Sequence, residues 1–167
     1  MQDDLAVGEF FTNQCLISGK IRTGGRRLSD ILNDARDSAL KLSDVQVVRI
    51  VNPKDVIAAH SGAILEKKGI VFALIREEGA DVPQSSFYKH VETREWDVFL
   101  TVPSFELSGR LHVRGTGDLR TMLFDRPGEF IPLTRAKAVF TLYPEVTFDG
   151  EVIVVNKSYI EVACTDV

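Results

Sequence analysis

The chain has 167 residues, with 44% apolar and 26% charged residues, so it can bury a core as one ordinary domain or two small ones. Its 24 acidic and 20 basic residues give a net charge of −4, which argues against nucleic acid as the main partner. Because no apolar run approaches the roughly 18 residues of a membrane span and the N-terminus lacks signal-peptide features, we expect a cytoplasmic protein with no membrane partner.

The sequence contains two similar segments, and this repetition guides the prediction of each element. Residues 16–21 (LISGKI) reappear as residues 106–111 (ELSGRL). Such self-similarity predicts two tandem copies of one supersecondary unit, at 6–76 and 95–165, separated by a polar linker at 77–94. Apolar positions that recur at constant spacing are expected to be buried: Leu28, Leu32, Leu42 and Val48, and their counterparts Leu119, Leu123, Leu133 and Val139.

Each unit is predicted to open with two strands. Residues 96–102 alternate in polarity with the period of a strand. The next strand is expected at 17–22 in the first copy and at 107–114 in the second. A Ser-Gly pair inside this strand predicts a bulge or a close approach of another backbone.

The middle of each unit is predicted to be a short helix followed by a buried strand. Apolar residues after Arg27 have helical spacing, and Pro127-Gly128 stops the helix in the second copy. We therefore expect helices at about 26–34 and 117–125. Buried strands at 39–42 and 130–133 follow, and each ends in a tight corner.

The remainder of each unit is predicted to be a strand and a closing hairpin. The strands are expected at 45–51 and 136–142. The first copy has an insertion, 56–61, which is predicted to form one helical turn with Asn52 as its cap. The predicted fold class is α+β and strand-dominated, with two tandem pseudo-symmetric β-β-α-β-β-β units, each a small barrel-like sheet, packed together on their apolar faces.

Three short patterns in the first copy point to a domain type. They are Ile-Ser-Gly at 17–19, Arg-Leu-Ser-Asp-Ile-Leu-Asn at 27–33 and Leu-Lys-Leu-Ser-Asp-Val at 40–45. Together they resemble an uncharacterised bacterial domain family of unknown function, present here in two tandem copies. The second copy matches less well, since 118–124 lacks the Ser-Asp and the Asn. The resemblance implies no activity and no site residue.

The best candidate site is the loop formed by Gly24, Gly25, Arg26 and Arg27. Glycines expose backbone N–H groups and arginines supply charged donors, so this loop is suited to a phosphate or carboxylate. The same glycines are also what a strand-to-helix turn requires. In the second copy Asp118 replaces an arginine, so only the first copy would bind an anion.

Other reactive residues form no recognisable constellation. Cys15 and Cys164 belong to no metal-binding motif, and they are interpreted as small buried side chains or as a disulfide between the first and last strands. His60, His90 and His112 lack the spacing of metal ligands. We predict no catalytic residue, no metal and no cofactor.

The sequence therefore favours a non-enzymatic structural or interaction protein, such as a scaffold, adaptor or assembly subunit of the bacterial cytoplasm. Its partners would be other proteins or further copies of itself, bound through strand edges left over by the fold. The alternative is a binding module or sensor for a small anionic ligand at Gly24–Arg27.

Overall fold

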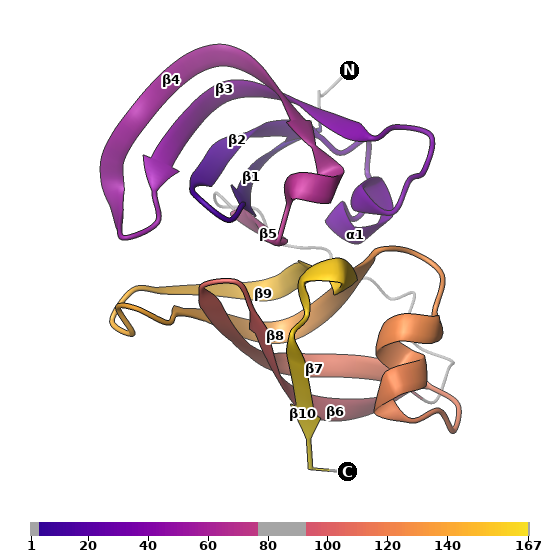
Figure 1. Ribbon diagram of the computed structural model, residues 1–167. Coiled ribbons are helices and arrows are strands. Elements are labelled where there is room, and N and C mark those ends of the chain that lie inside the picture. Colours follow the sequence, from indigo (N-terminus) through magenta and orange to yellow (C-terminus); the bar gives the residue numbers. More distant parts are fainter. Residues whose placement is uncertain (1–3, 77–92, 167) are drawn as a thin grey trace.

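The computed structural model describes residues 4–76 and 93–166, and its main feature is one ten-stranded antiparallel sheet (Figure 1). The N-terminal half, residues 4–76, contributes β1 (Leu5–Phe11), β2 (Leu16–Arg22), β3 (Ala39–Arg49), β4 (Asn52–Glu66) and β5 (Phe72–Arg76). The C-terminal half, residues 93–166, contributes β6 (Thr93–Val102), β7 (Phe105–Arg114), β8 (Phe130–Phe140), β9 (Thr147–Asn156) and β10 (Val162–Thr165). The strand order is β10-β6-β7-β8-β9-β5-β1-β2-β3-β4.

The predicted fold class, α+β with two tandem β-β-α-β-β-β units packed together as small barrel-like sheets, is wrong. The helical segments are short, and they are α1 (Leu28–Leu32), the 3-10 turns η1 (Lys67–Gly69) and η4 (Lys157–Tyr159), and the π-helical turn η3 (Thr121–Asp125). The sheet is continuous because β5 pairs with β9. The repeated apolar pattern indicates that each half packs against the other. It does not indicate that a strand of one half also pairs with a strand of the other.

The two halves have the same order of strands, β5-β1-β2-β3-β4 and β10-β6-β7-β8-β9. Figure 1 shows them as two curled parts of the sheet, one above the other, with α1 and η3 on the same side. Positions correspond in detail as well, since Val71 N donates to Phe11 O at 2.7 Å and Glu161 N donates to Thr101 O at 2.9 Å. We call two residues equivalent when they occupy the same register position in the two halves.

The second strand of each half carries the bulge that the Ser-Gly pair predicts. The register shifts between Ser18 and Lys20 in β2, and between Ser108 and Arg110 in β7. A Cβ atom on Gly109 would lie 3.1 Å from the Ala136 Cβ, so a side chain there would require the third strand, β8, to shift slightly. The prediction of a bulge or close approach is confirmed.

The corners predicted in both halves and the insertion predicted in the N-terminal half differ from expectation. The corners predicted after residues 42 and 133 are kinks within continuous strands, where Asp44 in β3 and Arg135 in β8 have φ of 49° and 47°. The insertion at 56–61 is part of β4 rather than a helical turn, because its backbone pairs with β3. Its local pattern is ambiguous, and the neighbouring strand decides the outcome.

The hydrophobic core consists of two clusters, and each includes residues from both halves. Phe11 and Phe72 of the N-terminal half stack at 4.2 Å, and they pack edge to face on Phe105 of the C-terminal half. The second cluster consists mainly of residues of the N-terminal half, and it includes Phe130 and Val154 of the C-terminal half. Six of the eight positions expected to be buried are buried, while Leu119 and Val139 are half-buried.

The boundaries predicted between the units fall mostly outside the described residues. The linker at 77–94 is described only from Thr93, where β6 begins. The halves are therefore related by the β5–β9 pairing and by their shared core.

Candidate functional site

The loop singled out from the sequence is a tight turn before α1. Gly24 and Gly25 have φ of +57° and +73°, the left-handed region that glycine tolerates. The guanidinium of Arg26 forms an ion pair with Asp34 at 3.1 Å and donates to the carbonyl of Asp30 at 3.0 Å. Arg27 immediately precedes the helix. The charge of Arg26 is thus used within the molecule, at the end of α1.

Asp34 is the centre of a small network of charged groups. Its carboxylate accepts bonds from the Arg36 guanidinium at 2.6 and 2.9 Å and from the Arg36 backbone N–H at 3.2 Å. These bonds from Arg36, with the further bond from Arg26, hold the pKa of Asp34 well below its usual range. The network fixes the turn that follows α1.

Two lysines in the 3-10 turns have a structural role that the sequence pattern did not reveal. The Lys67 Nζ donates to the carbonyls of Ile31 and Asp34 at 2.7 and 2.9 Å. The Lys157 Nζ donates to the carbonyl of Arg126 at 2.7 Å. Burial lowers the pKa of both lysines. Their recurrence at equivalent places in the two halves is the signal that could have identified them.

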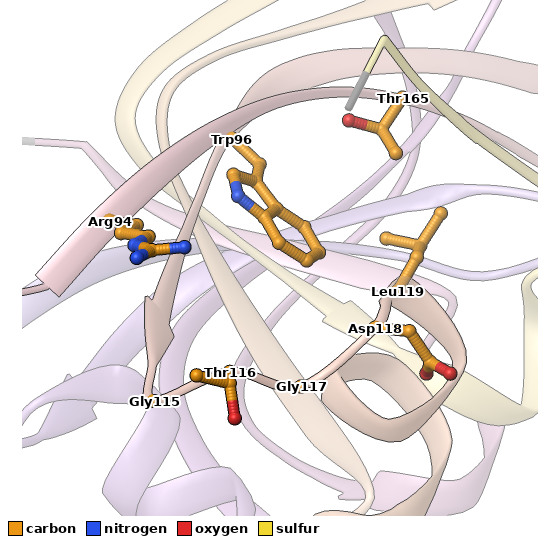
Figure 2. A pocket seen from close by; sticks show the side chains of 8 residues that line it. All are labelled: Arg94, Trp96, Gly115, Thr116, Gly117, Asp118, Leu119 and Thr165. Atoms are coloured by element: carbon orange, nitrogen blue, oxygen red, sulfur yellow. The ribbon is translucent and has the colours of Figure 1, made fainter.

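A hollow of ≈ 350 Å³ lies beside β6 in the C-terminal half. Figure 2 shows the Trp96 ring at its centre, between Arg94 and Leu119, with the backbone of 115–117 along one side. The Asp118 carboxylate accepts a bond from the Thr121 N–H at 2.8 Å, and that bond lowers the Asp118 pKa. The carboxylate thus caps the helical segment, and its lowered pKa keeps it ionised beside the hollow.

The remaining reactive residues are dispersed. Among the described residues, no group of three or more histidine, cysteine or acidic side chains is arranged to hold a metal ion. His60 and His112 lie in different halves, and His90 lies outside the described residues. Cys15 is half-buried and Cys164 is exposed, and both are free, so neither the disulfide nor the burial of Cys164 is observed.

The two outermost strands, β4 and β10, are the most distinctive feature of the surface. Within the described residues, 4–76 and 93–166, each is hydrogen-bonded to a strand on one side only. In β4, Ile64 is 67% exposed, whereas Val154, the equivalent residue of β9, is 1% exposed. In β10, Val162 is 50% exposed, whereas Phe72, the equivalent residue of β5, is fully buried. Apolar side chains that are buried at the junction therefore have exposed equivalents on both outer strands of the sheet.

The junction itself is a strand ladder reinforced by side chains. Phe72, Ala73 and Leu74 pair with Val155, Val154 and Ile153. Asn156 extends the contact, since its N–H donates to Val71 O at 2.9 Å and its Nδ2 donates to Ile70 O at 3.0 Å.

A second side chain also bridges the halves away from the ladder. Asn33, just after α1, donates to Phe130 O and accepts from Phe130 N, both at 2.9 Å. Phe130 pairs with Asn156 in the β8–β9 ladder, so Asn33 and Asn156 both supply directed polar contacts near the same end of β9.

In comparisons with known proteins, no family model, no curated protein and no solved structure matches this chain. Within the described residues, no helix is long and apolar enough to cross a membrane.

Proposed function

We propose that this protein is a non-enzymatic interaction protein of the bacterial cytoplasm, a scaffold, adaptor or assembly subunit that binds partner chains by strand addition. The binding surfaces are the outer edges of β4 and β10. The observation that carries the proposal is the exposure of Ile64 at a position where the equivalent Val154 is covered by a neighbouring strand.

The free edge of β4 is well suited to strand addition. The strand has 15 residues, Asn52 to Glu66, and its outer side presents backbone N–H and C=O groups that a further chain can pair with. Three of its apolar side chains, Val56, Ile57 and Ile64, are exposed. Long exposed edges with apolar side chains are avoided in proteins that do not associate, because they promote pairing.

A photo-cross-linking residue at Ile64, introduced in the cell that makes the protein, tests the proposal. We expect covalent adducts to a protein chain from this position. The matched control is the same residue at Leu142, which is 73% exposed in the connection between β8 and β9 and lies off both edges. Adduct yields at Ile64 no higher than at Leu142 would contradict the proposed function.

A further inference from the structure

We infer that the partner bound at these edges is a second copy of this chain, with β10 of one molecule pairing antiparallel to β4 of the next. This inference rests on the proposed function and specifies its partner. It follows from the way in which the two halves are joined within one molecule.

The junction between the halves is a head-to-tail contact. It joins the last strand of the N-terminal half, β5, to the fourth strand of the C-terminal half, β9. In the part of the chain that the structure describes, two strands have an unpaired edge: β10, which is the last strand of its half, and β4, which is the fourth strand of its half. They are therefore the same two kinds of strand that pair at the junction. A contact of this heterologous type can repeat from one molecule to the next.

The internal ladder predicts the register of the contact between molecules. Phe72, Ala73 and Leu74 are equivalent to Val162, Ala163 and Cys164, because both sets pair with the first strand of their half at matching positions. Counting along the fourth strands in the same way makes Val155, Val154 and Ile153 equivalent to Leu65, Ile64 and Ala63. Val162 therefore lies opposite Leu65, Ala163 opposite Ile64, and Cys164 opposite Ala63.

Two differences make the outer contact weaker than the junction. Asn156, which holds the junction, is replaced by Glu66, which has no side-chain donor when ionised. Val71, whose carbonyl receives the Asn156 N–H, is replaced by Glu161. The contact therefore brings two carboxylates to adjacent positions, and like charges across a strand pair oppose pairing. The ion pair of Glu66 with Lys68 Nζ at 3.1 Å reduces this repulsion in part. Association is expected to be reversible and to strengthen with salt.

An engineered disulfide tests the register in the full chain. Residues directly opposite each other in antiparallel strands have Cα atoms about 4.5–5.5 Å apart, within the range that a disulfide spans. In a Cys15→Ser background, Ala63→Cys is expected to cross-link to Cys164 of another molecule, and non-reducing gels would show dimers and longer covalent oligomers. Ala59→Cys, further along the same exposed strand, is the control and should stay monomeric.

The outcomes separate the inference from the proposed function. Monomers from Ala63→Cys, or equal cross-linking from Ala59→Cys, would overturn the inferred contact. If Ile64 is nevertheless photo-cross-linked to a different protein, the proposed function stands and the inference fails. If neither experiment yields adducts, both fail.

A charge exchange provides a second test that does not depend on cysteine chemistry. Glu161→Lys and Glu66→Lys are each expected to lower the dissociation constant by about two- to fivefold, because each replaces repulsion with attraction. The variant with both lysines should return toward the parent value. Sedimentation of the full chain over a range of concentrations measures these constants, and Glu151→Lys, exposed in β9 away from the edges, is the control. Additive effects of the two substitutions would contradict the pairing of these residues.

Discussion

At the junction between the halves, Phe72 of β5 and Val154 of β9 are buried against each other's strands, whereas at the ends of the sheet the equivalent Val162 and Ile64 are exposed. The strands have the same order and the same register in the two halves, so the backbone does not account for the difference. The difference lies in what covers each strand. Among the described residues, the β5 and β9 edges pair with each other, whereas the outer edges of β4 and β10 are unpaired.

The side chains at the junction differ from those at the outer edges, where we propose a contact between molecules. The junction carries Asn33 and Asn156, which form directed hydrogen bonds across it. The outer edges carry Glu66 and Glu161 instead. Charged residues at sheet edges limit uncontrolled pairing, so the outer contact is suited to reversible association and the inner contact to permanent association.

A matched pair of lysine substitutions gives the largest expected contrast between inner and outer edges. Val154→Lys places a charge without a partner in the core and should reduce the free energy of unfolding by about 3–5 kcal/mol. Ile64→Lys, at the equivalent exposed position, should change it by less than about 0.5 kcal/mol, because surface substitutions cost little. Chemical denaturation measures both. Similar losses from the two variants would show that the two edges are in the same environment.

Removing a polar contact at the junction should have an intermediate effect. Asn33→Ala leaves the Phe130 N–H and carbonyl without their partner, which should cost about 1–3 kcal/mol. Phe124→Ala is the control, since Phe124 is the counterpart of Asn33 in the repeated sequence, lies within η3 and is 49% exposed, and the substitution should be almost neutral. Equal thermal shifts for the two variants would remove Asn33 from the account of the junction.

Acid should weaken the N-terminal half through Asp34. Its pKa in the folded protein lies below its value in the unfolded chain, so its contribution to stability is fully present above about pH 4 and is lost as the pH falls below that value. Asp34→Asn lacks this contribution. The difference in melting temperature between parent and variant should therefore shrink as the pH is lowered from about 5 to about 3. A difference that stays constant over this range would contradict the role given to the Arg36 and Arg26 bonds.

The smallest effect is expected at the loop before α1. Combining Arg26→Ala with Arg27→Ala should reduce stability by less than about 1 kcal/mol, because exposed ion pairs contribute little. The double variant also tests the alternative function, since it removes two charged donors from the proposed anion site. Micromolar, salt-sensitive binding of a nucleotide by the parent, absent from the double variant, would favour a ligand-binding module over an interaction protein.

Local features of the fold were predictable because they depend on neighbouring residues. The bulge at the Ser-Gly pair, the short helix after Arg27 and most of the buried positions follow from residue type and spacing. The fold class was not predictable in this way, since the pairing of β5 with β9 joins segments about 80 residues apart. Residues 56–61 are a similar case. Their local pattern predicts a helical turn, whereas pairing with β3 makes them part of a strand.

The candidate surface could be predicted only in outline. A strand-rich chain must leave edges unpaired, and this indicates association without locating it. Identifying Ile64 and Val162 requires the order of the strands, which depends on contacts between distant segments. Cys164 is an example. Its residue type predicts burial, whereas its position in the outer strand β10 leaves it exposed.

Hydrogen exchange of the unmodified protein at low and high concentration tests the central claim most directly. The outward-facing backbone N–H groups within residues 62–66 and 162–165, which are not bonded to β3 or β6, should exchange rapidly in dilute solution and more slowly in concentrated solution, because pairing with another molecule protects them. The junction residues 72–74 and 153–155 should be protected at both concentrations. Exchange at the outer edges that is independent of concentration would contradict head-to-tail pairing of this chain.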